Sequence, residues 1–158
     1  MNWYAILHFL HLTIAAVWIG AAIANDLLHR RLRSVSDPGA RVALAQCGTA
    51  VTRKLELHGA ILMPILGFLM LAVGPGFAIF QTGAWFHLKL TAALVLIAVS
   101  LLSVSKQLEV ARAAEAGGVE LQRRLAAYFK LRLVGLLAIL AILYSVIPGL
   151  MRHALTVS

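Results

Sequence analysis

Three histidines in hydrophobic segments are the residues of this chain best suited to bind a metal ion or haem iron. His8 and His11 lie in the first segment, and His87 lies at the start of the third. An ionisable side chain inside a bilayer is costly unless it is paired, solvated or bound to a ligand. Histidines at similar depth in a membrane protein therefore indicate a site.

The first segment would present its polar side chains on one face of a helix. This face is made of positions three or four residues apart: His8, His11, Ala15, Trp18, Ala22, Asn25 and His29. The other faces carry mainly Leu, Ile, Val, Phe and Ala, which suit lipid or apolar neighbours. We therefore expect the polar face to turn towards protein or a cofactor.

The composition is that of an integral membrane protein. Hydrophobic residues make up 61% of the 158 residues and charged residues 13%, against roughly 45–50% and about 25% in soluble domains. The net charge is +8, but the basic residues gather between hydrophobic segments, which favours membrane topology over nucleic-acid binding. Cys47 is the only cysteine, so an internal disulfide and a cysteine metal cluster are excluded.

The hydrophobic segments predict four membrane spans in a single domain covering residues 1–158, since a bilayer needs about 20 apolar residues per helix. The second span is short, and the helix-forming segment 40–56 can extend it at its start. Asp37-Pro38-Gly39 before it is a turn signal, and Gly117-Gly118 should break the last connection. We expect an all-α, up-down-up-down four-helix bundle with spans at about 3–24, 57–73, 85–104 and 128–151.

The charges of the connections predict the orientation. The first and third connections are basic, whereas the middle one, GPGFAIFQTG, is uncharged. By the positive-inside rule the basic connections are cytoplasmic and both termini lie outside. The N-terminus, MNWYAIL, has no basic region ahead of it and is interpreted as a retained span rather than a signal peptide. We expect a multi-pass protein of a bacterial-type cytoplasmic (inner) membrane.

In that topology the three histidines fall within roughly two helical turns of one another near the outer side. A haem slot in a helical bundle needs imidazole ligands and small residues beside the ring. His11 and His87 are the predicted axial ligands, with His8 as the alternative. Lys89 could pair with a haem propionate, and Trp18 and Trp85 could wall the ring. The second span adds one face that allows close approach, formed by Gly59, Met63, Gly67, Met70 and Gly74.

Each of these residues also has a structural interpretation. His8 and His11 could be a helix-packing pair, Lys89 could extend to lipid headgroups, and Trp85 could be an interfacial aromatic residue. His29 stands beside two arginines and is expected to be solvated, without a ligand role. His58, at the start of the second span, lies off the glycine face.

Two motifs resemble those of a known superfamily. HLTIAAVWIG, from His11 to Gly20, is similar to the first helix of the HemJ-type protoporphyrinogen oxidases and the CopD-type copper-resistance membrane proteins. WFHLKL, from Trp85 to Leu90, resembles the opening of the third helix in HemJ-type members. The resemblance implies a membrane bundle that binds haem b, with His11 and His87 as the matched histidines and Lys89 as the matched lysine.

The HemJ-type Leu-Pro-Arg and Asn-Glu-x-Pro elements are absent, since the chain reads AAIANDLLHRR and YFKLRLVGLLAIL at these places. The histidines and the resemblance together predict a membrane protein that uses haem b for redox chemistry or electron transfer. Its substrate would be a porphyrinogen or another lipophilic reductant such as a quinol. The alternatives are a copper-handling membrane protein and a cofactor-free scaffold. Gly20 and Ala24 form a small-xxx-small pair that could support a homo-oligomer.

Overall fold

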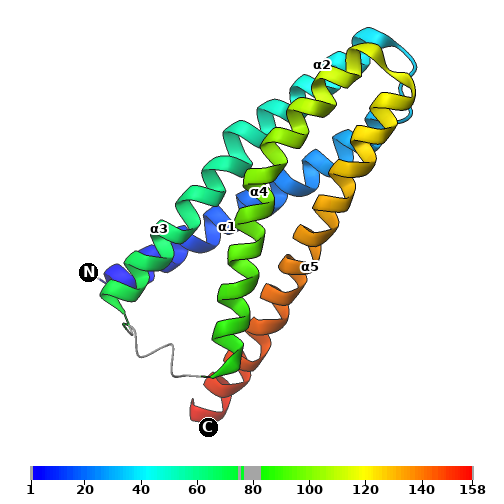
Figure 1. Ribbon diagram of the computed structural model, residues 1–158. Helices are drawn as coiled ribbons and strands as arrows, with labels where there is room; N and C mark the ends of the chain where they lie inside the picture. Colours follow the sequence, from blue (N-terminus) through cyan, green and yellow to red (C-terminus); the bar gives the residue numbers. More distant parts are fainter. Residues whose placement is uncertain (1, 75, 77–82, 158) are drawn as a thin grey trace.

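The computed structural model describes residues 2–74, 76 and 83–157, and from residue 146 onwards it describes the backbone alone. All regular structure in this part of the chain is helical (Figure 1). The elements are α1 (Trp3–Leu32), α2 (Pro38–Val51), the π-helical turn η1 (Thr52–Glu56), α3 (Leu57–Val73), α4 (Ala84–Ala116) and α5 (Gly118–Val157). The predicted all-α fold class is confirmed.

Four helices are long and apolar enough to cross a membrane. Three are α1, α4 and α5, and the fourth is the continuous helix Pro38–Val73 formed by α2, η1 and α3. The chain is therefore a multi-pass membrane protein with a four-helix bundle. Each helix is longer than its predicted span at the end bearing the basic connections, so the bundle continues beyond its apolar part. The uncharged connection GPGFAIFQTG lies largely outside the described residues.

The helix ends follow from local chemistry. The Asn2 side chain accepts a hydrogen bond from the backbone N–H of Ala5 and caps α1. Asp37 caps α2 in the same way, through Ala40, and Pro38 occupies the first helical position, where its missing N–H costs nothing. The expected turn at this site is therefore a helix start. Gly117, with φ of 67°, separates α4 from α5.

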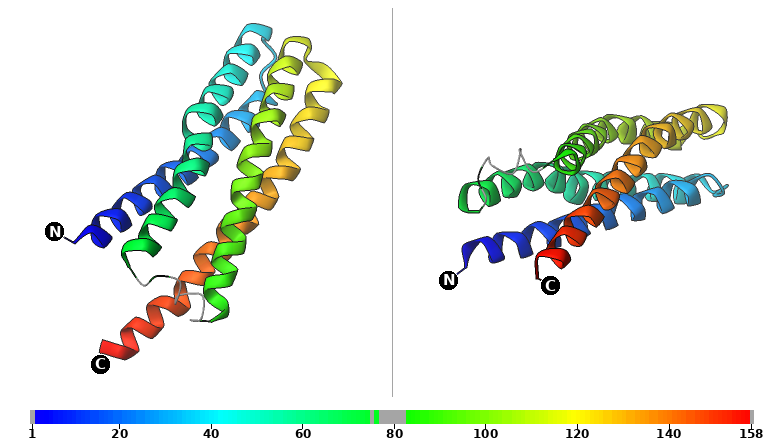
Figure 2. Two further views of the ribbon diagram at one scale, coloured as in Figure 1. Left: turned by 60° about the vertical axis from the view of Figure 1, so that its left-hand side comes forward. Right: turned by 90° about the horizontal axis from the view of Figure 1, so that it is seen from below.

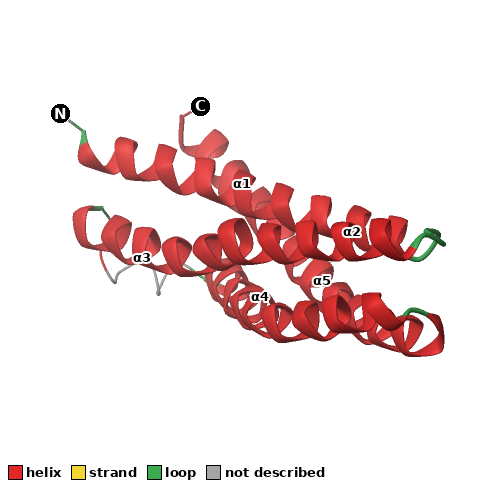
Figure 3. Cartoon of the chain, turned by 90° about the horizontal axis from the view of Figure 1, so that it is seen from above, coloured by secondary structure: helices red, strands yellow, loops and turns green. Residues whose placement is uncertain are grey.

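The helices are arranged as two pairs. α1 packs beside the α2–η1–α3 helix, and α4 packs along α5 (Figures 1 and 3). The two pairs lie close together where the α1–α2 and α4–α5 connections are, and they diverge towards the end that carries the N-terminus (Figure 2). We call the end with the α1–α2 and α4–α5 connections the basic end, because it carries residues 30–54 and 106–132. We call the opposite end the histidine end, because it carries His8, His11 and His87.

The buried apolar residues form two separate clusters. The membrane cluster, in the apolar part of the bundle, consists of Trp18, Ala60, Ala92, Leu96 and Ala138. The basic-end cluster lies in the helical extensions and consists of Leu32, Ala45, Val110, Ala113, Ala114, Leu121, Leu125 and Tyr128. Polar side chains fill the space between the two clusters, and these are described below.

The predicted polar face of α1 turns inwards over most of its length. Trp18, Ala22, Asn25 and His29 are buried, whereas His11 is half-buried and His8 is exposed. Small residues of the neighbouring helix make this contact close. A Cβ on Gly59 would stand only 2.6 Å from Cγ of Trp18. The glycine is therefore needed for α1 and α3 to approach.

This contact predicts the effect of one methyl group. Gly59→Ala should destabilise the bundle by about 1–3 kcal/mol, because the new methyl forces Trp18 out of its site. The measurement is thermal unfolding of the detergent-solubilised protein, followed by circular dichroism. Gly20→Ala is the control, since nothing lies within 4 Å of a Cβ there. Equal melting temperatures for the two variants would contradict the proposed contact.

Candidate functional site

The histidine end brings together residues from α1 and α4. His11 is half-buried on α1, and its Nδ1 atom is buried without a hydrogen-bond partner among the described residues. It lies within electrostatic range of Lys89 on α4 and of His8. Lys89 is also half-buried. The predicted lysine and one predicted histidine therefore lie within electrostatic range of each other.

The face of α4 that carries Lys89 also carries Trp85, four residues earlier. Trp85 is half-buried, and its indole Nε1 is buried with no hydrogen-bond partner in the described part of the chain. His87 lies two residues from each of them, and therefore about 200° away around the helix. Its side chain is exposed. Lys89 and Trp85 thus share one side of α4, and His87 lies on the other.

His8 and Trp18 lie above and below His11 on α1. The ring of His8 is 6.0 Å from that of Tyr4, measured between centroids, and the side chain is exposed. Trp18 is buried in the membrane cluster, with 4% of its surface accessible. Trp18 therefore closes the region below His11 with a large apolar surface.

The glycine face of α3 is open at the level of His11. Gly59 packs on Trp18, and Gly74 packs on Tyr4. Gly67 is midway between these two glycines in the sequence, and His11 is midway between Tyr4 and Trp18, so Gly67 and His11 lie at the same level. Nothing lies within 4 Å of the position that a Cβ on Gly67 would take. Space therefore exists beside α3 at the depth where the half-buried imidazole lies.

A second group of polar residues lies between the two apolar clusters. We call it the polar network, and it consists of Asn25, Asp26, His29, Thr52, Glu56, Gln107, Tyr128 and Arg132. At its centre Nη1 of Arg132 lies 2.8 Å from Oε2 of Glu56, and Nε of Arg132 lies 2.9 Å from Oδ1 of Asp26. The network therefore joins α1, η1 and α5 by ion pairs.

The π-helical turn η1 supplies two members of the network. Thr52 and Glu56 are fully buried, and the amide nitrogen of Asn25 donates to both, at 2.6 Å to Oγ1 and 2.9 Å to Oε1. The backbone N–H of Leu57 donates to the carbonyl of Thr52, five residues earlier, which is the π-helical pattern. Single π-helical turns inside α-helices occur frequently at functional sites.

One prediction about this region is wrong. His29 is not solvated: only 1% of its surface is accessible, and its ring stacks on Tyr128 with centroids 4.2 Å apart. The structure also buries Arg132, whose side chain is 8% exposed and whose partners are two carboxylates. In contrast, His58 is exposed, and its Nδ1 lies 3.1 Å from the carbonyl of Arg53.

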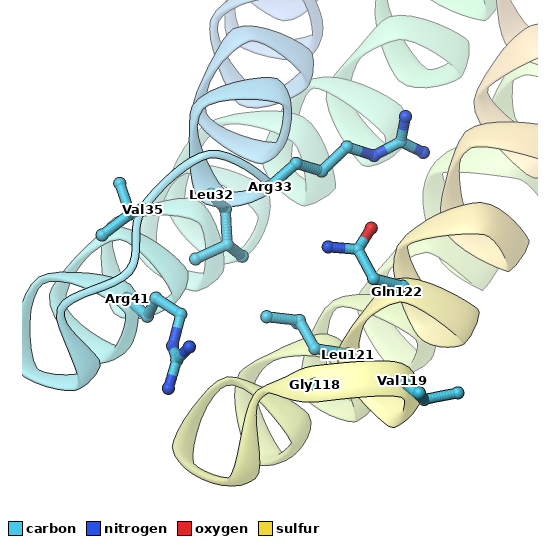
Figure 4. A pocket seen from close by; sticks show the side chains of 8 residues that line it. All are labelled: Leu32, Arg33, Val35, Arg41, Gly118, Val119, Leu121 and Gln122. Carbon is cyan, nitrogen blue, oxygen red and sulfur yellow. The ribbon is translucent and has the colours of Figure 1, made fainter.

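A cavity of about 360 Å³ lies at the basic end, between the close of α1 and the start of α5 (Figure 4). Its lining includes Leu32, Val35, Arg41, Leu121 and Gln122. None of the predicted site residues lines it. Two of its lining residues, Leu32 and Leu121, belong to the basic-end cluster, so the cavity lies away from the histidine end.

The described residues hold no group of three or more His, Cys, Asp and Glu side chains arranged to bind a metal ion. Comparisons with protein-family models, with curated proteins and with solved structures find no match to this chain. The resemblance to the HemJ-type and CopD-type superfamily therefore stays a prediction.

The polar network predicts a large effect from removing its cation. Arg132→Ala would leave the buried Glu56 carboxylate without its ion pair, which should cost about 3–5 kcal/mol of stability. Thermal unfolding in detergent measures the loss. Arg123→Ala removes an exposed arginine paired with Glu120 and should change the melting temperature little.

The double substitution Arg132→Met with Glu56→Gln removes both charges and should recover most of the stability lost in Arg132→Ala. If Arg132→Ala unfolds at the same temperature as Arg123→Ala, the ion pairs are not a structural requirement of the bundle.

Proposed function

We propose that this chain is an integral-membrane haem b protein that carries out redox chemistry or electron transfer. The observation that carries the proposal is the half-buried imidazole of His11, whose Nδ1 atom is buried and has no hydrogen-bond partner in the described part of the chain. A neutral imidazole has one nitrogen with a free lone pair, which haem iron accepts. The resemblance of the His11 and Trp85 motifs to haem-binding family members supports the same assignment.

Three further residues fit a haem at this place. Lys89 lies within electrostatic range of His11 and would supply an ammonium group for a propionate. The buried indole N–H of Trp85, on the same face of α4, has no partner in the described structure and could donate to a second oxygen. Trp18 would supply an apolar wall, and the open position at Gly67 would leave room for the group. These residues would bind and orient the group and exclude water from it.

A second ligand to the iron would come from one of two candidates, His8 or His87. Both are exposed to the surroundings of the bundle, and His87 lies on the face of α4 turned away from Lys89. We assign His11 as the ligand from α1 and leave these two histidines as alternatives for the second ligand.

The bound iron would supply one-electron chemistry, and the chain would set its potential through the ligands and the burial of the ring. The lipid-facing surroundings of the diverging helices favour a lipophilic reductant, which we propose is a porphyrinogen or a quinol. The copper-handling and scaffold functions are the alternatives, and no arrangement of described side chains favours either.

Absorption spectroscopy of the detergent-purified protein tests the proposal. We expect a Soret band that shifts on reduction with dithionite and that falls by at least about tenfold in His11→Ala. His58→Ala is the matched control, because His58 is exposed at the start of α3, nine residues before Gly67, and should leave the band unchanged. If the dithionite-reduced protein loses its Soret band in His8→Ala or in His87→Ala, the substituted histidine is the second ligand.

Colourless protein that is folded and contains no porphyrin after expression with added haem would exclude the proposal. Stoichiometric copper in such a preparation would favour the copper-handling alternative, and metal-free protein would favour the scaffold.

We also propose that the basic end is cytoplasmic and that both termini lie outside, in a bacterial-type inner membrane. Cys47 tests this, because it is exposed, is the only cysteine, and lies on α2 at the basic end. A membrane-impermeant maleimide should label it only after the cells are permeabilised.

The control is Cys47→Ser with Asn2→Cys, which moves the thiol to the exposed N-terminal residue and should allow labelling of intact cells. Labelling of Cys47 in intact cells would reverse the proposed orientation.

A further inference from the structure

Three buried acceptor atoms of the polar network point to a site that the haem proposal does not use. They are Nε2 of His29, Oδ1 of Asn25 and Oε1 of Gln107, and none has a hydrogen-bond partner among the described residues. The three side chains are between 0% and 1% exposed. Unpaired buried polar atoms are rare in native proteins because each costs the free energy of its lost hydration.

The other polar atoms of these side chains fix their orientation. The amide nitrogen of Asn25 donates to Thr52 and Glu56, so its oxygen must point away from them. The amide nitrogen of Gln107 donates to the carbonyl of Ala45 at 3.3 Å, which orients its oxygen likewise. Nδ1 of His29 lies 2.7 Å from the carbonyl of Asn25, so this nitrogen carries the hydrogen. Nε2 of the neutral ring is then a third acceptor.

The three side chains meet around Gly48 of α2, where space is scarce. A Cβ on Gly48 would stand 2.6 Å from Nε2 of Gln107, 2.9 Å from Oδ1 of Asn25 and 3.0 Å from Cε1 of His29. A group as small as a methyl does not fit at this point. The missing hydrogen-bond donor is therefore best supplied by the smallest one, a proton.

We propose that His29 is a proton-binding site inside the bundle. A proton from water at the basic end adds to the lone pair of Nε2, and the ring becomes an imidazolium without any other bond changing. Nε2 would then donate to the side chain of Gln107, which lies within hydrogen-bond range of the ring, and Oδ1 of Asn25 lies beside the same glycine as the ring. One added proton thus supplies a donor where the described side chains leave unpaired acceptors.

Burial of the ring and the charge of Arg132 oppose an imidazolium at His29, whereas Asp26 and the hydrogen bonds to Asn25 and Gln107 favour it. Asp26 on α1 and Glu56 on η1 contribute two negative charges, and Arg132 on α5 contributes one positive charge. The stacked ring of Tyr128, also on α5, is the remaining titratable group. α2 and α4 present the uncharged Gly48 and Gln107. An imidazolium would therefore balance the one excess negative charge of the network.

This site is independent of the haem proposal. His29 lies eighteen residues after His11 on α1, which is about 27 Å along the helix axis. The chain would take up and release this proton at the basic end, whatever group is bound at the histidine end.

Nuclear magnetic resonance of the full-length protein with ¹⁵N-labelled histidine, in lipid nanodiscs, tests the proposal. His29→Gln identifies the His29 signals. Between pH 5 and 8, about the range in which histidine titrates, we expect Nε2 of His29 to gain a proton that exchanges slowly with water. A His29 ring that stays neutral over the whole range in folded protein would overturn the proposal.

Substitutions at Gln107 separate proton binding from a structural role. Gln107→Leu removes the acceptor and should lower the ratio of protonated to neutral His29 by at least about tenfold at a fixed pH. Gln107→Glu keeps an acceptor at the same place and should hold the proton at least as well as the wild type. Gln122→Leu, at an exposed glutamine of α5, is the control. An unchanged ratio in folded Gln107→Leu would also overturn the proposal. If that variant does not fold, the protonation of His29 in Gln107→Glu and in the wild-type titration tests the proposal instead.

Discussion

The charge of Arg132 is the constraint on which the arrangement of the helices depends. A guanidinium stays charged at any physiological pH, and this one is 8% exposed, so carboxylates must be brought to it. Glu56 and Asp26 come from η1 and α1, and these elements make few other contacts with α5. Because lipid removes the hydrophobic drive for helices to associate, directional contacts such as these fix how the two helix pairs are rotated and aligned.

The sequence was sufficient to predict the class of fold and much of the α1 contact surface. Apolar runs separated by basic connections predict four spans, because length and composition are the requirements of a bilayer. The stripe from Trp18 to Asn25 is buried as expected, since the residues between its members suit lipid. Gly59 was expected to allow close approach, and it does so against Trp18. These features depend on helical periodicity, which the sequence carries directly.

The polar network could not be predicted in the same way, because its contacts join distant segments. Arg132 and Glu56 are 76 residues apart, and Arg132 stands near Lys130, which is exposed. His29 likewise precedes two exposed arginines, so its neighbours in sequence suggested solvent. Near the end of a span, periodicity alone does not tell a buried ion from a solvated one. The signals that were available are the arginine within the fourth apolar segment and the polar pair Asn25-Asp26 in the first.

The π-helical turn at Thr52–Glu56 sets the rotation of α3 relative to α2. In a uniform α-helix each residue advances about 100° around the axis. Each residue of the wider π-helical turn advances by a smaller angle, so α3 is rotated relative to a continuous α-helix and both halves can meet their own neighbours. Gly48 leaves room for the side chains of Gln107 and His29, and Gly59 leaves room for that of Trp18. The number of residues between these glycines is consequently fixed. Natural variants of this chain should accept new side chains in the stretch 49–58 more readily than an insertion or a deletion, which would turn all of α3 away from its partner.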